Sequence, residues 1–236
     1  MKNCVGLKRC WRKIRQRVTQ ILCSVPQTVE NNHIDWQGST HYWENRYLHG
    51  GNSGSGSYND LALFKAEIIN RFVKENNVGS VIEWGCGDGN QLLFAEYPDY
   101  IGLDVSEEAI RICSEKFFND KSKRFIHIGQ EGVFNQKADL VLSLDVIYHL
   151  IEDDVYDTYM KRLFLSSNRY VCIYSCNDDD DFPAVHIKHR KFTEWIDNNV
   201  GDQWKLLSYI KNKYPYNPSE ETKSSWSDFY FYELLR

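Results

Sequence analysis

The segment that most constrains the fold is an apolar run that ends in a glycine loop, residues 81–90, with the sequence VIEWGCGDGN. The first four residues predict a buried β-strand, and a short helix is expected over residues 90–95. Glycines at three alternate positions let the backbone turn sharply and approach a ligand closely at the carboxyl end of the strand. The segment therefore predicts an α/β protein with a ligand site at this edge of its sheet.

The rest of the chain alternates between strand-like and helix-like segments. This alternation predicts a Rossmann-like, mostly parallel seven-stranded sheet with helices on both faces. The last two strands have no strong helix between them, so an antiparallel C-terminal hairpin is expected. Strands are predicted over 80–85, 100–105, 124–129, 140–146, 170–174, 204–210 and 228–234, and helices over 60–76, 90–95, 106–118, 153–164 and 192–199.

The composition is that of one globular α/β domain in a reducing compartment. The chain has 236 residues, 42% of them apolar and 14% aromatic, and it contains no apolar run of the roughly 18 residues that a spanning helix needs. Seven cysteines, without any Cys-x-x-Cys pair, do not form a disulfide framework. A cytoplasmic protein is expected.

The charge is divided unevenly along the chain. The net charge is -5, but the first 25 residues hold seven Lys and Arg and no acid, which leaves -12 on the remainder. Such an acidic body disfavours nucleic acid as a partner, because affinity for nucleic acid depends largely on phosphate neutralisation.

Residues 1–30 form a basic leader whose aliphatic residues and Trp11 recur at helical spacing. An amphipathic helix of this kind packs on the body or on a partner, or it makes a peripheral membrane contact through residues 1–25. Cys4, Cys10 and Cys23 would be available there for acylation. A mitochondrial presequence is the third interpretation, because the leader is basic and free of acids.

The glycine loop carries acidic residues that suit a cationic ligand. Asp104 ends the second predicted strand, nineteen residues after Gly85, where it can accept hydrogen bonds from a ribose. A dinucleotide fingerprint would require glycine at position 90, which is Asn90, and would disfavour Glu83 and Asp88 beside a pyrophosphate. S-adenosylmethionine, with its sulfonium and ammonium, fits better. A nicotinamide-dependent oxidoreductase and a non-catalytic binding module remain alternatives.

At these residues the chain resembles the class I S-adenosylmethionine-dependent methyltransferases over residues 60–236. The resemblance implies that Gly85 and Gly87 line the methionine moiety and that Gln130 lies near the adenine. It places Asp145 at the end of the fourth strand. The cofactor residues expected within this domain are Glu83, Gly85, Cys86, Gly87, Asp88, Asn90, Asp104, Val105, Gln130 and Asp145.

Three further stretches are similar to a bacterial and viral subgroup of these methyltransferases that is associated with surface-polysaccharide or glycan assembly. They lie at 42–57, 145–150 and 186–193. The likeness implies an ordered, aromatic and Gly/Ser-rich flap, residues 31–59, in which Arg46, Ser53 and Gly54 contact the cofactor. A flexible linker is the alternative for the Gly/Ser run. The acceptor implied is a glycan or nucleotide-sugar, with a glycosyltransferase as a conceivable partner.

Methylation of a sugar hydroxyl needs a group that removes the hydroxyl proton. His149 is the first candidate, because imidazole titrates near neutrality and the residue follows Asp145 by four positions. His186 and His189, with Arg190, form a second group in the long connection after the fifth strand, and a satisfied structural role is the alternative for each. Asp145 is expected to orient cofactor or acceptor, and Tyr148 to contact the acceptor.

No metal site is predicted. The acidic run over residues 177–181 is expected to be a solvated loop, with Mg²⁺ or Ca²⁺ coordination or sugar binding as the alternative. Paired Cys and His at the usual zinc spacing are missing from the sequence. The end of the fourth strand also lacks the Asn/Asp-Pro-Pro-Tyr pattern of nucleic-acid amine methylation. Small-molecule and protein methyltransferases are the remaining alternatives for the acceptor.

Overall fold

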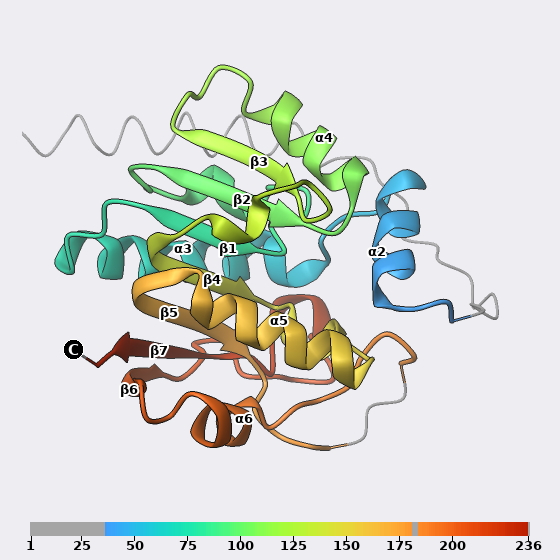
Figure 1. The fold of residues 1–236 in the computed structure, drawn as a ribbon. Helices are drawn as coiled ribbons and strands as arrows, with labels where there is room; N and C mark the ends of the chain where they lie inside the picture. The colour runs from blue at the N-terminus through green and yellow to red at the C-terminus, as the bar shows by residue number, and fades with distance from the viewer. Residues whose placement is uncertain (1–35, 181–183, 236) are drawn as a thin grey trace, which may run out of the picture. The chain divides into compact units, whose positions relative to one another are not determined.

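Seven strands form one mixed sheet in the order β3-β2-β1-β4-β5-β7-β6 (Figure 1). The computed structural model describes residues 36–180 and 184–235. All strands are parallel except β7, which is antiparallel to both β5 and β6. The strands are β1 Val81–Trp84, β2 Tyr100–Asp104, β3 Lys123–His127, β4 Ala138–Leu144, β5 Ser167–Ser175, β6 Trp204–Ile210 and β7 Asp228–Leu234.

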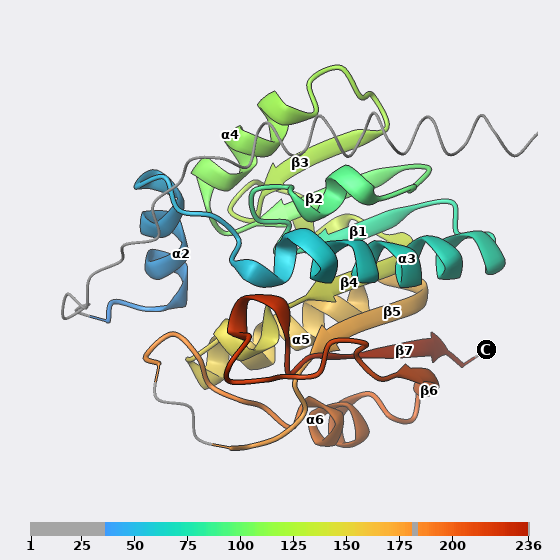
Figure 2. The same cartoon turned by 180° about the vertical axis from the view of Figure 1, so that it is seen from behind.

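Helices cover both faces of this sheet. Helices α5 and α6 lie on the face toward the viewer in Figure 1, and α3 lies on the opposite face, which Figure 2 shows. Helix α2 stands apart from both layers, across the carboxyl edge of the parallel strands. The helices are α2 Ser39–Leu48, α3 Asn59–Glu75, α4 Glu107–Lys116, α5 Asp153–Leu165 and α6 Phe192–Asn199.

Each face of the sheet has its own apolar core, because successive strand residues point to opposite faces. On β5, Val171 and Ile173 pack with α5 and α6, whereas Tyr170, Cys172 and Tyr174 belong to the core under α3. Both faces of the central strands are therefore buried. This explains why these strands are continuous apolar runs rather than alternating ones.

The structure confirms the predicted fold class, a Rossmann-like mostly parallel sheet of seven strands with an antiparallel C-terminal pair. The helix predicted over 90–95 is only a 3₁₀ turn, Gln91–Phe94. Helix α2 was not predicted, because its polar and aromatic sequence has no apolar stripe. Ser106 caps α4 as predicted, since its hydroxyl accepts a hydrogen bond from the Ala109 amide at 3.1 Å.

The predictions for the basic leader, residues 1–30, its membrane contact and its three cysteines lie outside the described residues, as do residues 31–35 of the expected flap. Within residues 36–180 and 184–235, no helix has both the length and the apolar composition needed to cross a bilayer.

Candidate active site

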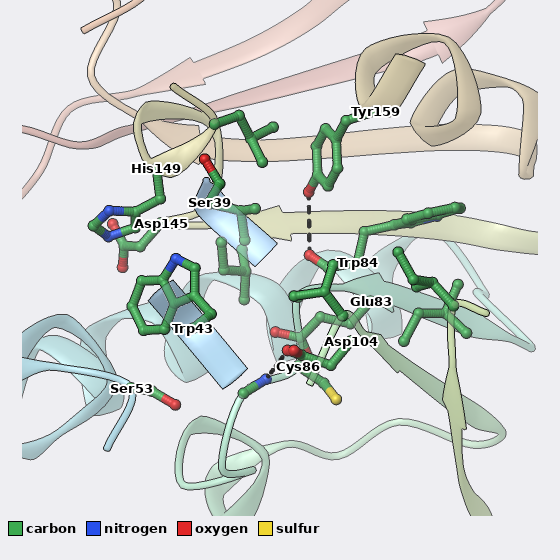
Figure 3. A pocket seen from close by; sticks show the side chains of 18 of the residues that line it. Ser39, Trp43, Ser53, Glu83, Trp84, Cys86, Asp104, Asp145, His149 and Tyr159 are labelled. Carbon is green, nitrogen blue, oxygen red and sulfur yellow. Dashed lines mark hydrogen bonds between the residues drawn. The ribbon is translucent and has the colours of Figure 1, made fainter. Parts of the chain in front are cut away.

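A cavity of about 410 Å³ opens where the carboxyl ends of β1, β2 and β4 meet α2 and α5 (Figure 3). Ligands bind at this edge in open α/β sheets, because the loops there diverge to either side of the sheet. The glycine loop and the α2 residues Trp43 and Tyr47 all line it. Of the predicted site residues, the lining includes Ser53, Glu83, Gly85, Cys86, Gly87, Asp88, Asp104, Val105, Asp145 and His149.

The glycines at 85 and 87 are required by both conformation and space. Their φ angles are +84° and +54°, values that L side chains rarely adopt. A Cβ at Gly85 would lie 2.5 Å from a Val146 methyl group, and one at Gly87 would lie 2.2 Å from Ser53 Oγ. Only glycine lets the loop run this close to its neighbours and leave the cavity open above it.

Asp104 ends β2 and points its carboxylate into the middle of the cavity. Oδ2 accepts a hydrogen bond from the Gly87 amide at 2.9 Å, and Oδ1 accepts one from the Ser106 amide at 2.9 Å. Burial raises the pKa of this carboxyl group, and the backbone hydrogen bonds oppose that effect. Each oxygen keeps an acceptor position, so the side chain can bind the two hydroxyls of a ribose.

Two polar residues of the glycine loop, Asp88 and Asn90, form hydrogen bonds with the flap. Asp88 Oδ2 accepts hydrogen bonds from the Ser53 amide at 3.1 Å and from the Tyr58 hydroxyl at 2.6 Å. Asn90 donates to the Ser57 carbonyl at 2.7 Å. Asp88 still lines the cavity, but Asn90 does not. The departure from glycine at position 90 is thus explained by attachment of the flap.

Glu83 and Cys86 line the cavity with groups whose pKa values are raised. Burial raises the pKa of Glu83 to about 7, although a 2.6 Å hydrogen bond from the Tyr100 hydroxyl opposes this. Contact with Cys113 and burial raise the pKa of the Cys86 thiol. The Cys86 thiol is therefore protonated at neutral pH, which does not suit it to nucleophilic chemistry.

The far end of the cavity is an apolar slot. Leu103, Val105, Ile128 and Phe134 line it together with Trp84. The Phe134 and Trp84 rings are nearly parallel, with centroids 6.2 Å apart. Apolar and aromatic surfaces of this kind suit a flat aromatic group such as adenine. Gln130 is exposed and lies outside the lining, so the side chains nearest to this slot are Ile128 and Phe134 rather than the predicted glutamine.

Within the described residues 36–59, the flap forms α2 and an ordered turn, and it belongs to the wall of the cavity. Ser53 Oγ accepts a hydrogen bond from the Asp88 amide at 2.9 Å and lies 3.1 Å from the Tyr47 hydroxyl. Arg46 lies outside the lining: its Nε donates to the Asn52 carbonyl at 2.6 Å, and its guanidinium lies over the Trp43 ring. Gly54, with φ +83°, completes the turn without lining the cavity. Arg46 and Gly54 thus shape the flap, and Ser53 faces the ligand space.

Asp145 adopts an unusual backbone conformation at the end of β4, with φ +59°. Its Oδ2 lies 2.8 Å from the Nζ atom of Lys65, a fully buried lysine of α3. Its Oδ1 accepts hydrogen bonds from Ser227 at 2.8 Å and Tyr148 at 3.1 Å. The carboxylate is therefore held as the anion of a buried ion pair, which suits orientation of a cation rather than proton abstraction.

His149 lies on the turn after β4 and lines the cavity beside Trp43 (Figure 3). Its Nδ1 is 2.9 Å from the His186 carbonyl oxygen. Because a carbonyl can only accept, Nδ1 carries the proton, and Nε2 of the neutral ring has a free lone pair. Burial lowers the pKa of His149 to about 4, so the ring is neutral throughout the physiological range.

The second predicted group, His186, His189 and Arg190, lies behind His149 and outside the cavity lining. The His186 ring is stacked between Tyr42 and His149, with centroids 4.8 and 5.7 Å away. His189 is paired with Asp178 at 2.6 Å. Tyr148, also predicted to contact the acceptor, instead donates to Asp145.

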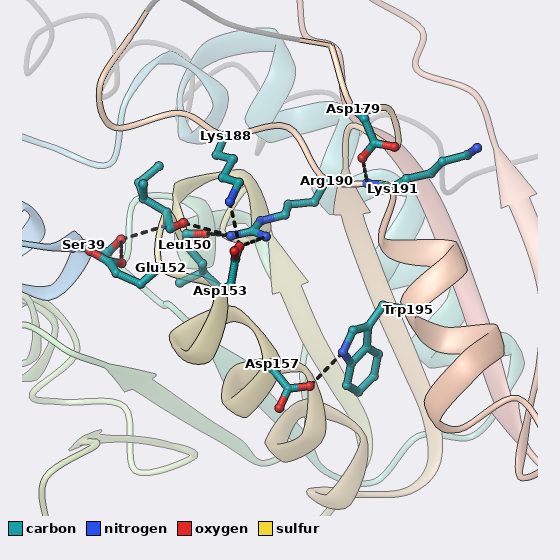
Figure 4. Close-up of polar contacts among 11 residues, drawn as sticks. Ser39, Leu150, Glu152, Asp153, Asp157, Asp179, Lys188, Arg190, Lys191 and Trp195 are labelled. Carbon is teal, nitrogen blue, oxygen red and sulfur yellow. Dashed lines mark hydrogen bonds and ion pairs between the residues drawn. The ribbon is translucent and has the colours of Figure 1, made fainter.

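Arg190 fixes the turn that carries His149 (Figure 4). Its Nη2 donates to the carbonyls of Leu150 and Ile151 at 2.8 and 3.0 Å, and its Nη1 pairs with Asp153. Glu152, in the same turn, accepts a 2.6 Å hydrogen bond from Ser39 of α2. The turn, the flap helix and the segment around Arg190 are thus joined at the start of α5.

Several residues of the site were missed by sequence reasoning. Lys65 had a readable signal, because it is a base on the apolar stripe of a predicted helix, next to positions 61, 68 and 69. The Tyr159 hydroxyl donates to the Trp84 carbonyl at 3.1 Å and accepts a hydrogen bond from the Ser143 hydroxyl at 2.7 Å, and nothing in the sequence marks it. Trp43 and Tyr47 also line the cavity, and both belong to the aromatic stretch of the predicted flap.

A methyltransferase domain family model matches residues 59–205, more than half of the chain. The chain belongs to this family. The match starts at α3 and includes the whole cofactor-loop region, while α2 and the C-terminal strand lie outside it. A search of curated proteins found no match.

Solved structures of methyltransferases share the fold. The N-methyltransferase NodS from Bradyrhizobium japonicum WM9, in complex with S-adenosyl-L-homocysteine, is 12% identical and has a TM-score of 0.65, with 84% of this chain and 100% of that chain covered. The methyltransferase domain of bacterial CtHen1-C is 17% identical with a TM-score of 0.58, covering 75% and 100%. Magnesium protoporphyrin IX methyltransferase from Synechocystis PCC 6803 is 16% identical with a TM-score of 0.56, covering 84% and 95%.

Proposed function

We propose that this chain transfers a methyl group from S-adenosylmethionine to a hydroxyl of a glycan or nucleotide-sugar, with His149 as the general base. The observation that carries the proposal is the tautomer of His149. Its Nδ1 proton is committed to the His186 carbonyl, so the basic Nε2 is available in the same cavity as the glycine loop and Asp104. Membership of the methyltransferase family accounts for methyl transfer, and the His149 imidazole can accept the proton of a hydroxyl group.

The residues that line the cavity fit the cofactor part by part. Asp104 has acceptor positions for the ribose hydroxyls, and the slot beside Val105 and Phe134 suits the adenine. Lys65 and Asp145 present opposite charges, which suit the carboxylate and ammonium of the methionyl end. The faces of Trp43 and Tyr47 suit a sulfonium. NodS and the protoporphyrin methyltransferase were crystallised with S-adenosyl-L-homocysteine, which supports this assignment.

The bound cofactor supplies a methyl group that is already activated by its sulfonium. The chain must then align the acceptor and remove one proton. With the cofactor bound, His149 Nε2 would take the proton of the acceptor hydroxyl as that oxygen receives the methyl group. A base with a pKa of about 4 is sufficient, because the proton becomes strongly acidic once the oxygen carries the methyl group.

The acceptor end of the cavity has the side chains that sugars favour. Trp43 provides an aromatic surface 4.8 Å from the His149 ring, measured between centroids, and Thr40 and Asp154 provide a hydroxyl and a carboxylate in the same lining. Sugar rings stack on aromatic surfaces through their C–H faces and hydrogen-bond with carboxylates through their hydroxyls. This combination supports a sugar acceptor over a large planar one.

Calorimetry with S-adenosyl-L-homocysteine tests the cofactor assignment. Wild-type protein should bind it, and Asp104→Ala should weaken binding at least tenfold, because two hydrogen bonds to a buried charged acceptor are lost. Asp154→Ala is the matched control at the acceptor end and should bind the cofactor normally. Binding of NADH in place of S-adenosyl-L-homocysteine would instead support an oxidoreductase.

An acceptor screen with radiolabelled S-adenosylmethionine tests the substrate class. Rhamnose, fucose and heptose glycans and their nucleotide-sugars form the expected set, and small phenols, amines and peptides form the competing set. Methylation of only the competing set would replace the glycan assignment with a small-molecule or protein methyltransferase. Cofactor binding without methylation of any acceptor would support a binding module.

A further inference from the structure

A cysteine, a carboxylate and a histidine meet at the end of β5, outside the cavity. Cys176 directly follows Ser175, the last residue of the strand, and Asp178 lies two residues further on. His189 comes from the segment that precedes α6. One potential ligand atom of each residue lies within 4.8 Å of the other two. In the described part of the chain this is the only such group of three Cys, His, Asp or Glu side chains.

We propose that Cys176, Asp178 and His189 bind a transition-metal ion of the zinc class. Sulfur, nitrogen and oxygen donors together favour Zn²⁺ and related ions, whereas Mg²⁺ and Ca²⁺ require oxygen donors. A thiolate and a carboxylate also neutralise the charge of a divalent ion. By sequence alone, the acidic run over residues 177–181 has a hard cation as one alternative, but the fold brings the softer donors of Cys176 and His189 to Asp178.

The packing around the cluster favours an ordered site with one open side. Cys176 is 2% exposed and the His189 side chain 5%, whereas the Asp178 side chain is 43% exposed. The His189 ring also packs against Trp226, with centroids 5.8 Å apart. Two donors are thus held rigidly by buried surroundings, and the third lies at the solvent boundary. Solvent has access to a fourth coordination position from this side.

Metal binding requires a small rearrangement that this geometry permits. His189 Nδ1 and Asp178 Oδ1 are now 2.6 Å apart in a hydrogen bond. Two ligands of tetrahedral zinc with bonds of about 2.1 Å are separated by about 3.4 Å. Metal binding must therefore break this hydrogen bond and move the Asp178 carboxylate outward by about 1 Å. Asp178 can make this movement because its side chain is half exposed.

The site would brace the segment that orients His149. This segment, residues 184–190, is here called the strap. It supplies the His186 carbonyl that fixes His149, and the Lys188 amide donates to the Tyr148 carbonyl at 2.8 Å. A metal bound by His189 would tie the strap to the end of β5. The effect on His149 rests on the proposed function, whereas metal binding itself does not.

Cobalt spectroscopy on the full-length protein tests the site without any measurement of activity. After removal of metal with a chelator, addition of Co²⁺ should produce a thiolate-to-cobalt charge-transfer band at one equivalent, and Zn²⁺ but not Mg²⁺ should abolish it. Cys176→Ser should lose the band. Asp178→Asn changes a half-exposed side chain and leaves the core intact, and it should weaken cobalt affinity at least tenfold.

Cys172→Ser is the matched control, because Cys172 is a buried thiol of the same strand that packs under α3. It should keep the band. Absence of a charge-transfer band in the wild type, or equal bands in wild type, Cys176→Ser and Asp178→Asn, would overturn the proposal and leave a hydrogen-bonded pair beside a buried thiol. Failure of S-adenosyl-L-homocysteine to bind would overturn the proposed function but not the metal site.

Discussion

The fully buried ammonium of Lys65 lies 2.8 Å from Oδ2 of Asp145, so that α3 and the end of β4 are joined by an ion pair in the wall of the cavity. The ammonium also lies over the Tyr174 ring, 5.3 Å from its centroid. Because little water screens a buried ion pair, removing one partner leaves the other charge buried without compensation.

Lys65→Met should therefore destabilise the protein by about 3–5 kcal/mol, because it leaves the Asp145 carboxylate buried without its partner. Urea denaturation measures this loss. Lys161→Met removes the exposed pair with Asp157 and should cost less than about 1 kcal/mol. Lys65→Met/Asp145→Asn should recover a large part of the stability. Equal losses of unfolding free energy for the two lysine substitutions would show that the buried Lys65–Asp145 pair stabilises the protein no more than an exposed pair does.

His149→Ala should lower kcat by about 10²-fold or more while cofactor affinity changes little, because only proton removal is lost. The rate of the wild-type enzyme should stay flat from pH 8 down to about pH 5, since the pKa of His149 is lowered to about 4. Single-turnover rates across this range provide the measurement. A decline centred near pH 6.5, or full activity of His149→Ala, would remove His149 from the role of base.

The same lowered pKa has a consequence for stability. The unfolded histidine protonates near pH 6.5, while folded His149 stays neutral until about pH 4. Its contribution is complete above pH 6.5 and is lost as the pH falls toward 4, by up to about 3 kcal/mol. The difference in unfolding free energy between wild type and His149→Ala should narrow over this window. A difference independent of pH would contradict the lowered pKa.

Ionisation of Glu83 should make the pH dependence of stability run in the opposite direction. Burial raises its pKa to about 7, above the unfolded value of 4.5. Its contribution is therefore complete below pH 4.5 and is lost as the pH rises through 7. Glu83→Gln, which keeps an acceptor for the Tyr100 hydroxyl, should be less destabilised than wild type between pH 5 and 8. Parallel stability curves for the two proteins would show that the carboxyl group is ionised throughout.

Gly87→Ala should lower affinity for S-adenosyl-L-homocysteine at least tenfold, because the new Cβ would lie 2.2 Å from Ser53 Oγ and displace the flap. Gly50→Ala is the matched control. Gly50 also has a positive φ, +76°, but no atom lies within 4 Å of a Cβ there. It should therefore carry only the backbone penalty of about 1 kcal/mol. Calorimetric titration of both variants separates these effects, and equal affinities would exclude a role for flap docking.

Arg190→Gln should lower kcat about tenfold and leave the KM for S-adenosylmethionine unchanged, because Arg190 positions the His149 turn from outside the cavity. Loss of its hydrogen bonds to two carbonyls should also cost about 2 kcal/mol of stability. Lys188→Met removes the exposed partner of the same Asp153 and should change little. A rise in acceptor KM alone would instead support direct contact between Arg190 and the substrate.

Much of the fold could be predicted from the sequence, because the central parallel strands β1, β2, β4 and β5 are buried on both faces and are therefore largely apolar runs. The bounds of α6, β6 and β7 agree with the prediction residue for residue. Helix α2 could not be predicted, since its residues contact the cavity and the α5 turn rather than a core. Its helical form depends on tertiary contacts such as Ser39 with Glu152.

The glycine loop, the carboxylate of Asp104 and the position of His149 after the fourth strand could all be recognised from the sequence. These features follow from local spacing, because strand ends and glycine turns are set by neighbouring residues. The arrangement of their partners required the folded chain: Asn90 holds the flap, Lys65 pairs with Asp145, and Cys176 meets His189. Such contacts join residues far apart in the chain, and their geometry is fixed by how the elements pack, which no local pattern records.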